Sequence, residues 1–547
     1  MYARKSCLCL FGISGFTIAI FLGLSQINDS AATYDEPVHL ASGYLALKTS
    51  LPPLNWHNHP PLAEMWAAFP LLFLKPSTML QSPQMGRLYY FADEFLYKNR
   101  IDPEKLLNCA RKWNLLTLSL IVFPVILAWS WEMGAGWAVL ASCVLFAFCP
   151  PLFSNFSLAT TDGMPAVFYF LTCFFLSREP RKNRDWAFAG LSFSAALASK
   201  FSMIALPVVI LCGLLTERRV YPDKRVKLLG PLLFIATGAL VLIAAYGGNI
   251  SLYDRGLAET LGRLNQGRPS FLMGHYSLNG FWDYFPVALA LKTPILLLLL
   301  SAIGLFLGFK RPSIKVLWLI LPPVAYFVAA LLSKTDIGYR HILPIYPFLI
   351  VLAAWGFSEL REKLNPRFFA LASCIAFFWI ALSVGDSFPH FLAYFNEVSG
   401  GPRKGYLFLA DSNLDWGQGL KDLSQELKKR GNPPIVLSYF GVADPSYYHI
   451  RYFPLAFYTN IDRKEGIVLP EKKGPLLFAV SATNLDAVYF VDKNLFGWVK
   501  KRRPVFIAGN SIFVYDLTHD QEGRNILADL LTLSGSKEAA GIVLSGS

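Results

Sequence analysis

The sequence predicts a polytopic α-helical membrane protein followed by an α/β part at its C-terminal end. Charged residues make up only 16% of the chain and hydrophobic residues 54%, whereas soluble proteins carry roughly 25% charged residues. Apolar runs such as the one that begins at Val287 are long enough to cross about 30 Å of hydrocarbon as helices. From about residue 386 onward, the composition is that of a soluble protein.

Eleven apolar segments are expected to span the membrane. The first follows a basic start and runs to about Gln26 with no clear A-x-A cleavage site, so we interpret it as an uncleaved span whose N-terminus lies inside. The fifth and sixth segments are short, and tilted or re-entrant helices would also fit them. The segments are 7–26, 113–131, 135–152, 158–177, 186–200, 202–216, 228–247, 287–309, 314–333, 342–358 and 367–385.

Loop charges agree with this topology. Lys and Arg accumulate in short cytoplasmic loops because positive charge resists translocation. The net charge of +13 is therefore explained by membrane orientation, and no nucleic-acid partner is expected. Four loops predicted to lie inside each hold at least three basic residues, and they are 177–186, 216–228, 309–315 and 358–367.

Three long segments then fall outside the membrane. We expect residues 1–385 to form a transmembrane domain that includes two long outer loops, 27–112 and 248–286. Residues 386–520 are expected to form a soluble α/β domain, and residues 521–547 a polar, partly disordered tail.

The α/β expectation comes from three strand-like runs and one helical pattern. The strand-like runs accompany an amphipathic helix, GLKDLSQELKKRG, that Gly431 closes. The strand-like runs are PPIVLSYFG from Pro433, GPLLFAVSA from Gly474 and RPVFIAGNSIFVYDL from Arg503.

Ionisable residues from distant parts of the chain gather at the predicted outer boundary of the membrane. Such residues are costly there unless they have a partner or a function. Their convergence on one interface favours a pocket between helices. The residues are Asp35, Glu36, His39, His57, His59, Asp162, Lys200, Arg255, Lys334, Asp336, Arg340 and His341.

Each of these residues also has a structural interpretation. Asp35 could cap a helix that begins at Pro37, and Asp162 could cap the fourth span. Lys200 could extend its ammonium group toward the headgroups, and Arg340 could form a structural ion pair. A carboxylate that caps a helix can still be catalytic, so both interpretations stay open.

The histidines of the first outer loop do not by themselves predict a metal site. His57 and His59 as zinc ligands would need further partners at organised spacing, and the sequence supplies none. An interfacial helix anchored by Trp56 and Trp66 is the favoured interpretation. We expect no metal and no cofactor, although a divalent cation is compatible with the pattern.

Six elements in order carry a resemblance to a known family. They are the DE pair at Asp35, HPPLAEMW from His59, Arg111, LATTDGMPAVFYF from Leu158, ALASKFS from Ala196 and GYRHILPIYPF from Gly338. Together they resemble the polyprenyl-phosphate-sugar-dependent membrane glycosyltransferases of the protein O-mannosyltransferase type, which have the GT-C fold and are related to the aminoarabinose transferases. The resemblance covers roughly residues 1–385.

The resemblance implies an inverting transfer of a sugar from a dolichyl- or undecaprenyl-phosphate donor to a hydroxyl of a protein or glycolipid. It places the reaction on the extracytoplasmic face, at the plasma membrane in a prokaryote. Asp35 matches the family's base, and Glu36 beside it is expected to be a second catalytic residue that orients the acceptor or the donor. The implied phosphate ligands are Arg111, ranked first, and then Lys200, Arg340 and His341.

Three further residues are expected in the substrate pocket, namely His59, Asp162 and Tyr339. The aminoarabinose transferases carry a lysine where this chain has His59, which argues against lipid A as the acceptor. The chemistry fits the implied roles, because a leaving phosphate needs fixed positive charge and an acceptor hydroxyl needs a base within about 3 Å.

Two other functions compete with this one. A lipid-linked-sugar transporter or flippase could use interfacial charges, but such proteins commonly show inverted repeats and charges near the midplane. The sequence shows no clear repeat, and its polar groups collect on one side. A non-catalytic protein that binds a glycan or partner is the second alternative. There Asp411, Asp415 and Trp416 would line a carbohydrate site or simply form a turn and a helix cap.

Overall fold

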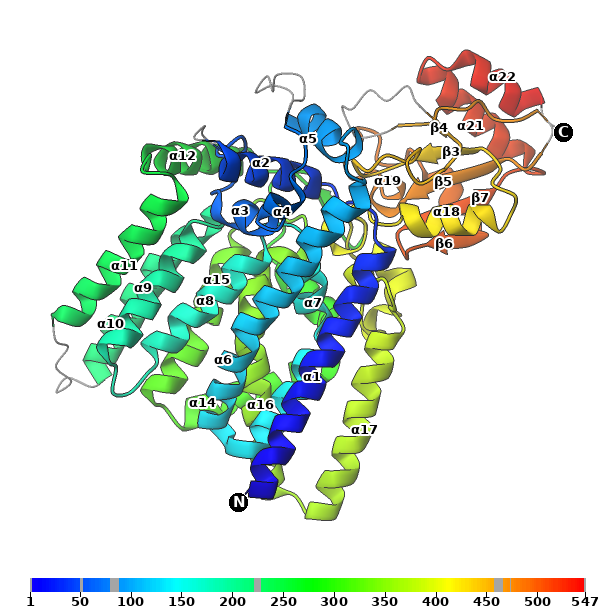
Figure 1. Cartoon of the computed structure of the whole chain (residues 1–547). Helices are drawn as coiled ribbons and strands as arrows, with labels where there is room; N and C mark the ends of the chain where they lie inside the picture. Colours follow the sequence, from blue (N-terminus) through cyan, green and yellow to red (C-terminus); the bar gives the residue numbers. More distant parts are fainter. Residues whose placement is uncertain are drawn as a thin grey trace.

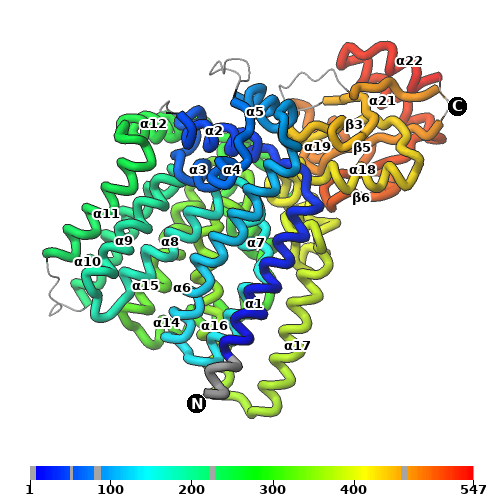
Figure 2. Tube along the Cα trace, viewed as in Figure 1, coloured from blue at the N-terminus to red at the C-terminus, as the bar shows by residue number. Residues whose placement is uncertain are grey.

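A helical bundle and a smaller α/β part make up the computed structural model (Figures 1 and 2). It describes residues 2–49, 53–78, 88–220, 228–456, 466–472 and 474–545. The bundle helices run side by side, and the α/β part lies beyond the end at which α1 (Tyr2–Asp29) finishes. That end is predicted to face outward and is called the outer end below.

Six helices of the described chain are long and apolar enough to cross a membrane, which confirms the predicted class. A seventh candidate is the pair α13 (Tyr284–Lys292) and α14 (Ile295–Lys310), bent by 115°. Shorter apolar helices are α8 (Gly163–Leu176) and α11 (Leu229–Ala245). The six are α1, α6 (Pro103–Ala147), η2 (Phe201–Ala205) with α10 (Leu206–Val220), α15 (Ile314–Leu331), η3 (Tyr339–Ile345) with α16 (Tyr346–Lys363), and α17 (Pro366–Gly385).

Helix α6 reverses its direction at Gly134 and Ala135, whose backbone angles are not helical. The rings of Phe123 and Phe146 pack with their centroids 4.7 Å apart. A continuous helix would separate these two residues by roughly 35 Å. The two predicted segments 113–131 and 135–152 therefore form a hairpin.

The predicted segment 287–309 is broken into α13 and α14, and each of the remaining predicted segments coincides with helical residues, including α9 (Asn183–Leu197) for 186–200. The count of eleven crossings stays a prediction, because several of these helices are shorter than the hydrocarbon requires.

The two long outer loops fold over the outer end of the bundle (Figure 1). Gly43 allows a close approach here, since a Cβ atom on it would lie 2.1 Å from the carbonyl oxygen of Glu64. The first loop forms α2 (Glu36–Lys48), α3 (Leu62–Ala68), α4 (Leu71–Leu74) and α5 (Leu88–Tyr97). The second forms α12 (Ser251–Gln266) and the hairpin of β1 (Ser270–Leu272) and β2 (His275–Ser277).

The C-terminal part contains the expected sheet, with strand order β4-β3-β5-β7-β6. Strand β3 is parallel to β4 and β5, whereas β7 is antiparallel to β5 and β6. The predicted amphipathic helix is α18 (Leu420–Lys428). The strands are β3 (Ile435–Ser438), β4 (Tyr452–Pro454), β5 (Leu477–Ser481), β6 (Phe506–Ala508) and β7 (Ile512–Asp516). Short helices are α7 (Pro150–Phe156) in the bundle, and α19 (Ala482–Leu485) and α20 (Gly497–Lys500) here.

The predicted partly disordered tail is wrong for the described residues up to 545. They form α21 (Gln521–Leu533) and α22 (Lys537–Ser545). Leu527, Leu531 and Val543 are buried in the main apolar core. The composition of the tail is polar on average, but its apolar residues recur at helical spacing and so give each helix a buried face.

Between α17 and the sheet the chain returns to the bundle through four 3₁₀ turns. Lys292 of α13 donates hydrogen bonds to the carbonyl oxygens of Leu392, at 3.0 Å, and Asn413. The largest apolar core also includes residues from both parts. A domain boundary at residue 385 therefore stays a prediction. The turns are η4 (Phe391–Ala393), η5 (Glu397–Ser399), η6 (Pro402–Leu407) and η7 (Asp411–Asn413).

Candidate active site

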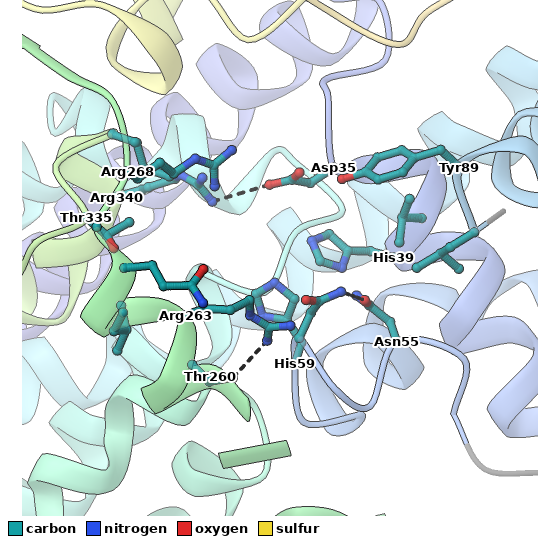
Figure 3. Close-up of a pocket in the computed structure, with 17 residues that line it drawn as sticks. Asp35, His39, Asn55, His59, Tyr89, Thr260, Arg263, Arg268, Thr335 and Arg340 are labelled. Carbon is teal, nitrogen blue, oxygen red and sulfur yellow. Dashed lines mark hydrogen bonds and ion pairs between the residues drawn. The ribbon is translucent and has the colours of Figure 1, made fainter. Parts of the chain in front are cut away.

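A cavity of about 420 Å³ opens at the outer end of the bundle. In Figure 3, Asp35 and Tyr89 face Arg340 and Arg268 across it. The wall comes from both outer loops and from the segment before η3. The lining residues used below are Asp35, His39, Asn55, His59, Tyr89, Thr260, Arg263, Arg268 and Arg340.

Asp35 directs its carboxylate toward this cavity instead of capping a helix. It stands directly before α2 with φ −92° and ψ −21°, and its side chain accepts no capping hydrogen bond from the described backbone of that helix. One carboxylate oxygen lies 3.5 Å from Nη1 of Arg340, and the side chain is 25% exposed. Asp102, by comparison, does cap α6. The capping interpretation of Asp35 is therefore wrong, and its carboxylate can reach a substrate.

Arg340 joins Asp35 to a buried ionic cluster. Its Nη1 also lies 3.4 Å from Asp162, and Asp162 forms a second ion pair with Lys200. Burial opposes ionisation of Asp162, but Lys200 and Arg340 outweigh it and hold the pKa of this carboxyl below its usual value. Asp162 makes no capping bond to the described backbone of α8, so its carboxylate balances two cations.

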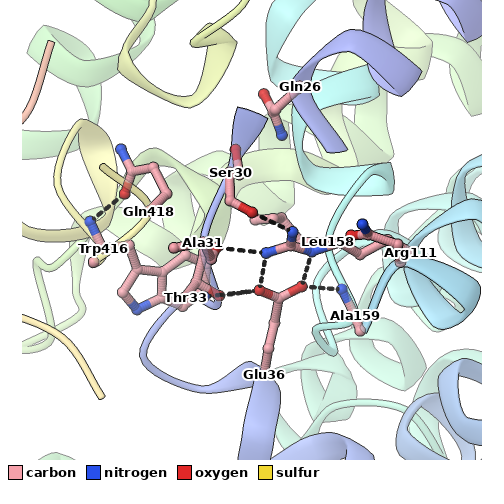
Figure 4. Close-up of polar contacts among 12 residues, drawn as sticks. Gln26, Ser30, Ala31, Thr33, Glu36, Arg111, Leu158, Ala159, Trp416 and Gln418 are labelled. Atoms are coloured by element: carbon pink, nitrogen blue, oxygen red, sulfur yellow. Dashed lines mark hydrogen bonds and ion pairs between the residues drawn. The ribbon is translucent and has the colours of Figure 1, made fainter. Parts of the chain in front are cut away.

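Glu36 and Arg111 form a buried clamp next to the cavity (Figure 4). Nε and Nη2 of Arg111 donate to the two oxygens of Glu36 at 2.8 and 2.6 Å. Arg111 also donates to the carbonyls of Ser30 and Ala31. Its donor groups are thus occupied, and neither residue is exposed. The expected roles of Arg111 as first phosphate ligand and of Glu36 as the residue that orients a substrate stay predictions, and neither residue is among the described residues that line the cavity.

The clamp connects segments that are distant in sequence. Glu36 also accepts hydrogen bonds from the backbone and hydroxyl of Thr33 and from the amide of Ala159. It thereby ties the end of α1, the start of α2, α6 and the loop before α8. Asp35 directly precedes Glu36 in the chain. The buried pair of Glu36 and Arg111 therefore holds the backbone from which the Asp35 side chain projects.

Two histidines lie together on the cavity wall in different electrostatic environments. His39 Nδ1 lies 2.8 Å from Glu64, and the rings of His39 and His59 meet edge to face with centroids 5.1 Å apart. Burial lowers the pKa of His39, but Glu64 outweighs it and the net shift is upward. Burial lowers the pKa of His59 well below its usual value, and His39 and Lys200 add to this. His59 is therefore a neutral polar group at neutral pH.

Tyr339 and His341 do not reach the cavity, although both neighbour Arg340. The hydroxyl of Tyr339 is buried and accepts a hydrogen bond from Asn155 at 2.9 Å. Neither residue is among the described residues that line the cavity. Successive side chains of a 3₁₀ helix point about a third of a turn apart, so only one of the three faces the site. The expected roles of Tyr339 as a pocket residue and of His341 as a phosphate ligand therefore stay predictions that this cavity does not support.

Sequence reasoning missed the second outer loop's contribution. Arg263 of α12 lines the cavity and donates hydrogen bonds to the carbonyl of His57 and to Thr260. Arg268, just beyond α12, lines it as well. Spacing could suggest an amphipathic α12 but not which face would meet the first loop. Glu64 was also missed, although it stands inside the quoted stretch HPPLAEMW.

A metal site is not evident in the part of the chain that the structure describes. It contains no group of three or more His, Cys, Asp or Glu residues arranged to hold an ion. The described residues that line the cavity include the carboxylate of Asp35, the guanidinium groups of Arg263, Arg268 and Arg340, and polar rings.

Known proteins resemble this chain in sequence and in fold. Residues 119–246 match the family described as dolichyl-phosphate-mannose-protein mannosyltransferase. The match covers less than half of the 547-residue chain and is therefore a local similarity to that family. The matched segment includes α8, α9 and the Asp162–Lys200 ion pair. No curated protein sequence matches the chain.

Two solved structures share the fold of this chain over nearly its whole length. ArnT from Cupriavidus metallidurans bound to undecaprenyl phosphate is 12% identical, covers 94% of this chain and 99% of its own, and has a TM-score of 0.52. The apo state of ArnT is 13% identical, with 94% and 98% coverage and a TM-score of 0.50. This likeness confirms the expected GT-C fold.

Proposed function

We propose that this chain is a membrane glycosyltransferase that moves a sugar from a polyprenyl-phosphate donor to an acceptor hydroxyl with inversion, and that Asp35 is the general base. The observation that carries this proposal is the Asp35 carboxylate, which lines a 420 Å³ cavity and faces Arg340 at 3.5 Å. A carboxylate that can reach a hydroxyl and a guanidinium that can reach a phosphate are the two groups that the reaction requires.

The donor phosphate is best assigned to the guanidinium groups of the cavity. Arg268 and Arg263 line it together with Arg340, and a guanidinium matches phosphate oxygens with a fork of N–H donors. Lys200 is assigned a supporting role, because its ammonium neutralises Asp162 behind Arg340. Arg111, which the resemblance ranks first, is not among the described residues that line the cavity.

The reaction then follows a single displacement at the sugar's anomeric carbon. The acceptor oxygen forms a bond to this carbon while its proton passes to the Asp35 carboxylate. The bond between the anomeric carbon and the phosphate oxygen breaks, and its electrons leave with the polyprenyl phosphate. Guanidinium groups stabilise the charge that develops on this leaving group. A covalent sugar intermediate on the protein is not required.

The donor and acceptor classes are also part of the proposal. ArnT has been solved with undecaprenyl phosphate, which supports a polyprenyl phosphate in a chain of the same fold. The acceptor is a hydroxyl of a protein or glycolipid. The site faces the extracytoplasmic side of the membrane, which is the plasma membrane if the source is prokaryotic. His59 on the wall is a neutral group where the aminoarabinose transferases carry a lysine.

The direct test replaces Asp35 by Asn, which keeps the shape of the side chain and removes the base. The purified full chain is given a radiolabelled polyprenyl-phosphate hexose or pentose and membranes that lack the chain as the acceptor source. We expect Asp35→Asn to lower the transfer rate by roughly 100-fold or more, the usual contribution of a general base.

The matched control is Asp529→Asn, an exposed change on α21 that leaves the cavity untouched. It is expected to transfer sugar at the wild-type rate. Wild-type turnover by Asp35→Asn would remove Asp35 from the role of base. Movement of labelled lipid across vesicles without a new glycosidic bond would favour the transporter instead.

A further inference from the structure

The cavity's Arg340 is held by a segment of the C-terminal part, residues 410–416. Nε of Arg340 donates a hydrogen bond to the hydroxyl of Ser412 at 2.9 Å. The plane of the guanidinium lies over the ring of Trp416, 4.2 Å from its centroid. These contacts engage Nε and the centre of the guanidinium, whereas its Nη1 approaches Asp35 and Asp162.

Ser412 is itself fixed between two parts of the backbone. Its hydroxyl donates to the carbonyl of Ile337 at 2.7 Å while it accepts from Arg340. Gly338 makes this approach possible, because a Cβ atom there would lie 2.2 Å from the Ser412 oxygen. The hydroxyl thus sets the distance between the segment and the start of η3.

The segment is anchored in turn to the end of strand β5. The amide of Asp411 donates to the hydroxyl of Thr483 at 3.0 Å, and the amide of Thr483 donates to the carboxylate of Asp415 at 2.9 Å. The hydroxyl of Tyr489 donates to the carboxylate of Asp411. Asp411 has a positive φ of 55°, a conformation that side chains seldom adopt unless their surroundings impose it.

We propose that the C-terminal α/β part completes the active site by orienting Arg340, with Ser412 and Trp416 as positioning residues. This inference rests on the proposed function. With its Nε and one face engaged, Arg340 keeps Nη1 between Asp35 and Asp162, at 3.5 and 3.4 Å. A guanidinium free to rotate would present its charge to the leaving phosphate for only part of the time.

The first test compares Ser412→Ala with Ser412→Thr in the purified full chain. Transfer of labelled sugar from the polyprenyl-phosphate donor gives kcat and KM, and thermal unfolding gives stability. Loss of a hydrogen bond to a charged group predicts a roughly 10- to 100-fold fall in kcat/KM for Ser412→Ala. Ser412→Thr keeps the hydroxyl and is expected to restore most of the activity. Equal activity of Ser412→Ala and the wild type would overturn the inference.

A double-mutant cycle separates positioning from general support of the fold. Arg340→Lys removes the Nε–H donor, so Ser412→Ala should cause no further loss of kcat/KM in that background. Multiplicative losses in the double variant would overturn the inference, because they would mean that Ser412 does not act through Arg340. Ser534→Ala, an exposed change at the end of α21, is the control and should behave as the wild type.

Variants of Trp416 provide an independent test if the Ser412→Ala protein does not fold. Trp416→Phe keeps an aromatic face for the guanidinium and is expected to retain more activity than Trp416→Leu, at similar unfolding temperatures. Equal activity of the two variants would count against positioning by the ring. If the wild type does not transfer sugar, the proposed function and this inference are both overturned. If the wild type transfers sugar and the variants of residues 410–416 transfer it equally well, only the inference is overturned.

Discussion

Adjacent acidic residues have opposite environments in this chain. Asp35 lines the cavity and is partly exposed, whereas Glu36 is fully buried and bonded to Arg111. The sequence predicted that the pair matters, since two carboxylates follow a membrane span directly. It could not predict that one residue would face the cavity and the other an arginine 75 positions away. The backbone turn that leads into α2 decides which of the two side chains is buried and which one faces the cavity.

The clamp leads to a stability prediction for Glu36→Gln. The change leaves Arg111 buried without a countercharge, which typically costs about 3–5 kcal/mol. We expect a clearly lower thermal unfolding temperature for the purified protein. The exposed Glu362→Gln on α16 is the matched control and should unfold as the wild type does. An unchanged unfolding temperature with a raised KM for the donor would return Arg111 and Glu36 to the substrate site.

At the scale of elements, the packing of α2 on α3 determines the cavity wall. Gly43 lets α2 approach the backbone of α3 at Glu64. Glu64 then binds His39 of α2 at 2.8 Å and Asn55 of the intervening loop at 2.7 Å. Two short helices of low intrinsic stability thus form one rigid wall, because a buried carboxylate joins them.

Gly43→Ala is therefore expected to separate the two helices. Its Cβ would lie 2.1 Å from a backbone oxygen that cannot rotate away, and overpacking of this kind costs about 1–3 kcal/mol. We expect both the unfolding temperature and the sugar-transfer rate to fall. Gly262→Ala in α12 is the control, since a Cβ there meets nothing within 4 Å and alanine favours a helix. Similar behaviour of the two variants would show that the α2–α3 contact is not required.

At the scale of the whole molecule, the region between the helical bundle and the sheet contains a buried acid, Asp415, whose pKa is shifted. Burial raises the pKa of Asp415 to about 7, and hydrogen bonds from Thr483 lower it only in part. The unfolded chain releases this proton near pH 3.8, so folding retains a proton that the unfolded state has lost. The contribution of Asp415 to stability is thus greatest below that pH and declines as the pH rises to about 7.

Asp415→Asn removes this titration. We expect the unfolding temperature of the variant to depend less on pH between about 4 and 7 than that of the wild type, with the difference most evident near pH 7. Thermal unfolding in a series of buffers at constant ionic strength measures it. Asp529→Asn, an exposed acid, should leave the wild-type pH dependence in place. Parallel curves for wild type and Asp415→Asn would contradict the assigned protonation.

The positions of the helices could be predicted from sequence because hydropathy is a local property. A run of apolar residues is sufficient to indicate a helix that crosses lipid, whatever the rest of the chain does. The strands of the C-terminal part could also be predicted, because their residue pattern is likewise a local property of the sequence. The polar tail was misjudged because average composition conceals an amphipathic period, and α21 and α22 bury one face each.

The sequence by itself determined the membrane class, the helical segments, the outer gathering of charge and the prominence of Asp35. Tertiary structure alone decided that Arg111 belongs to Glu36, that Arg263 and Arg268 reach the cavity, and that Ser412 holds Arg340. The physical reason is range. Hydrophobic burial in lipid acts on each segment separately, whereas hydrogen bonds and ion pairs need two groups within about 3 or 4 Å, and only packing brings distant residues that close.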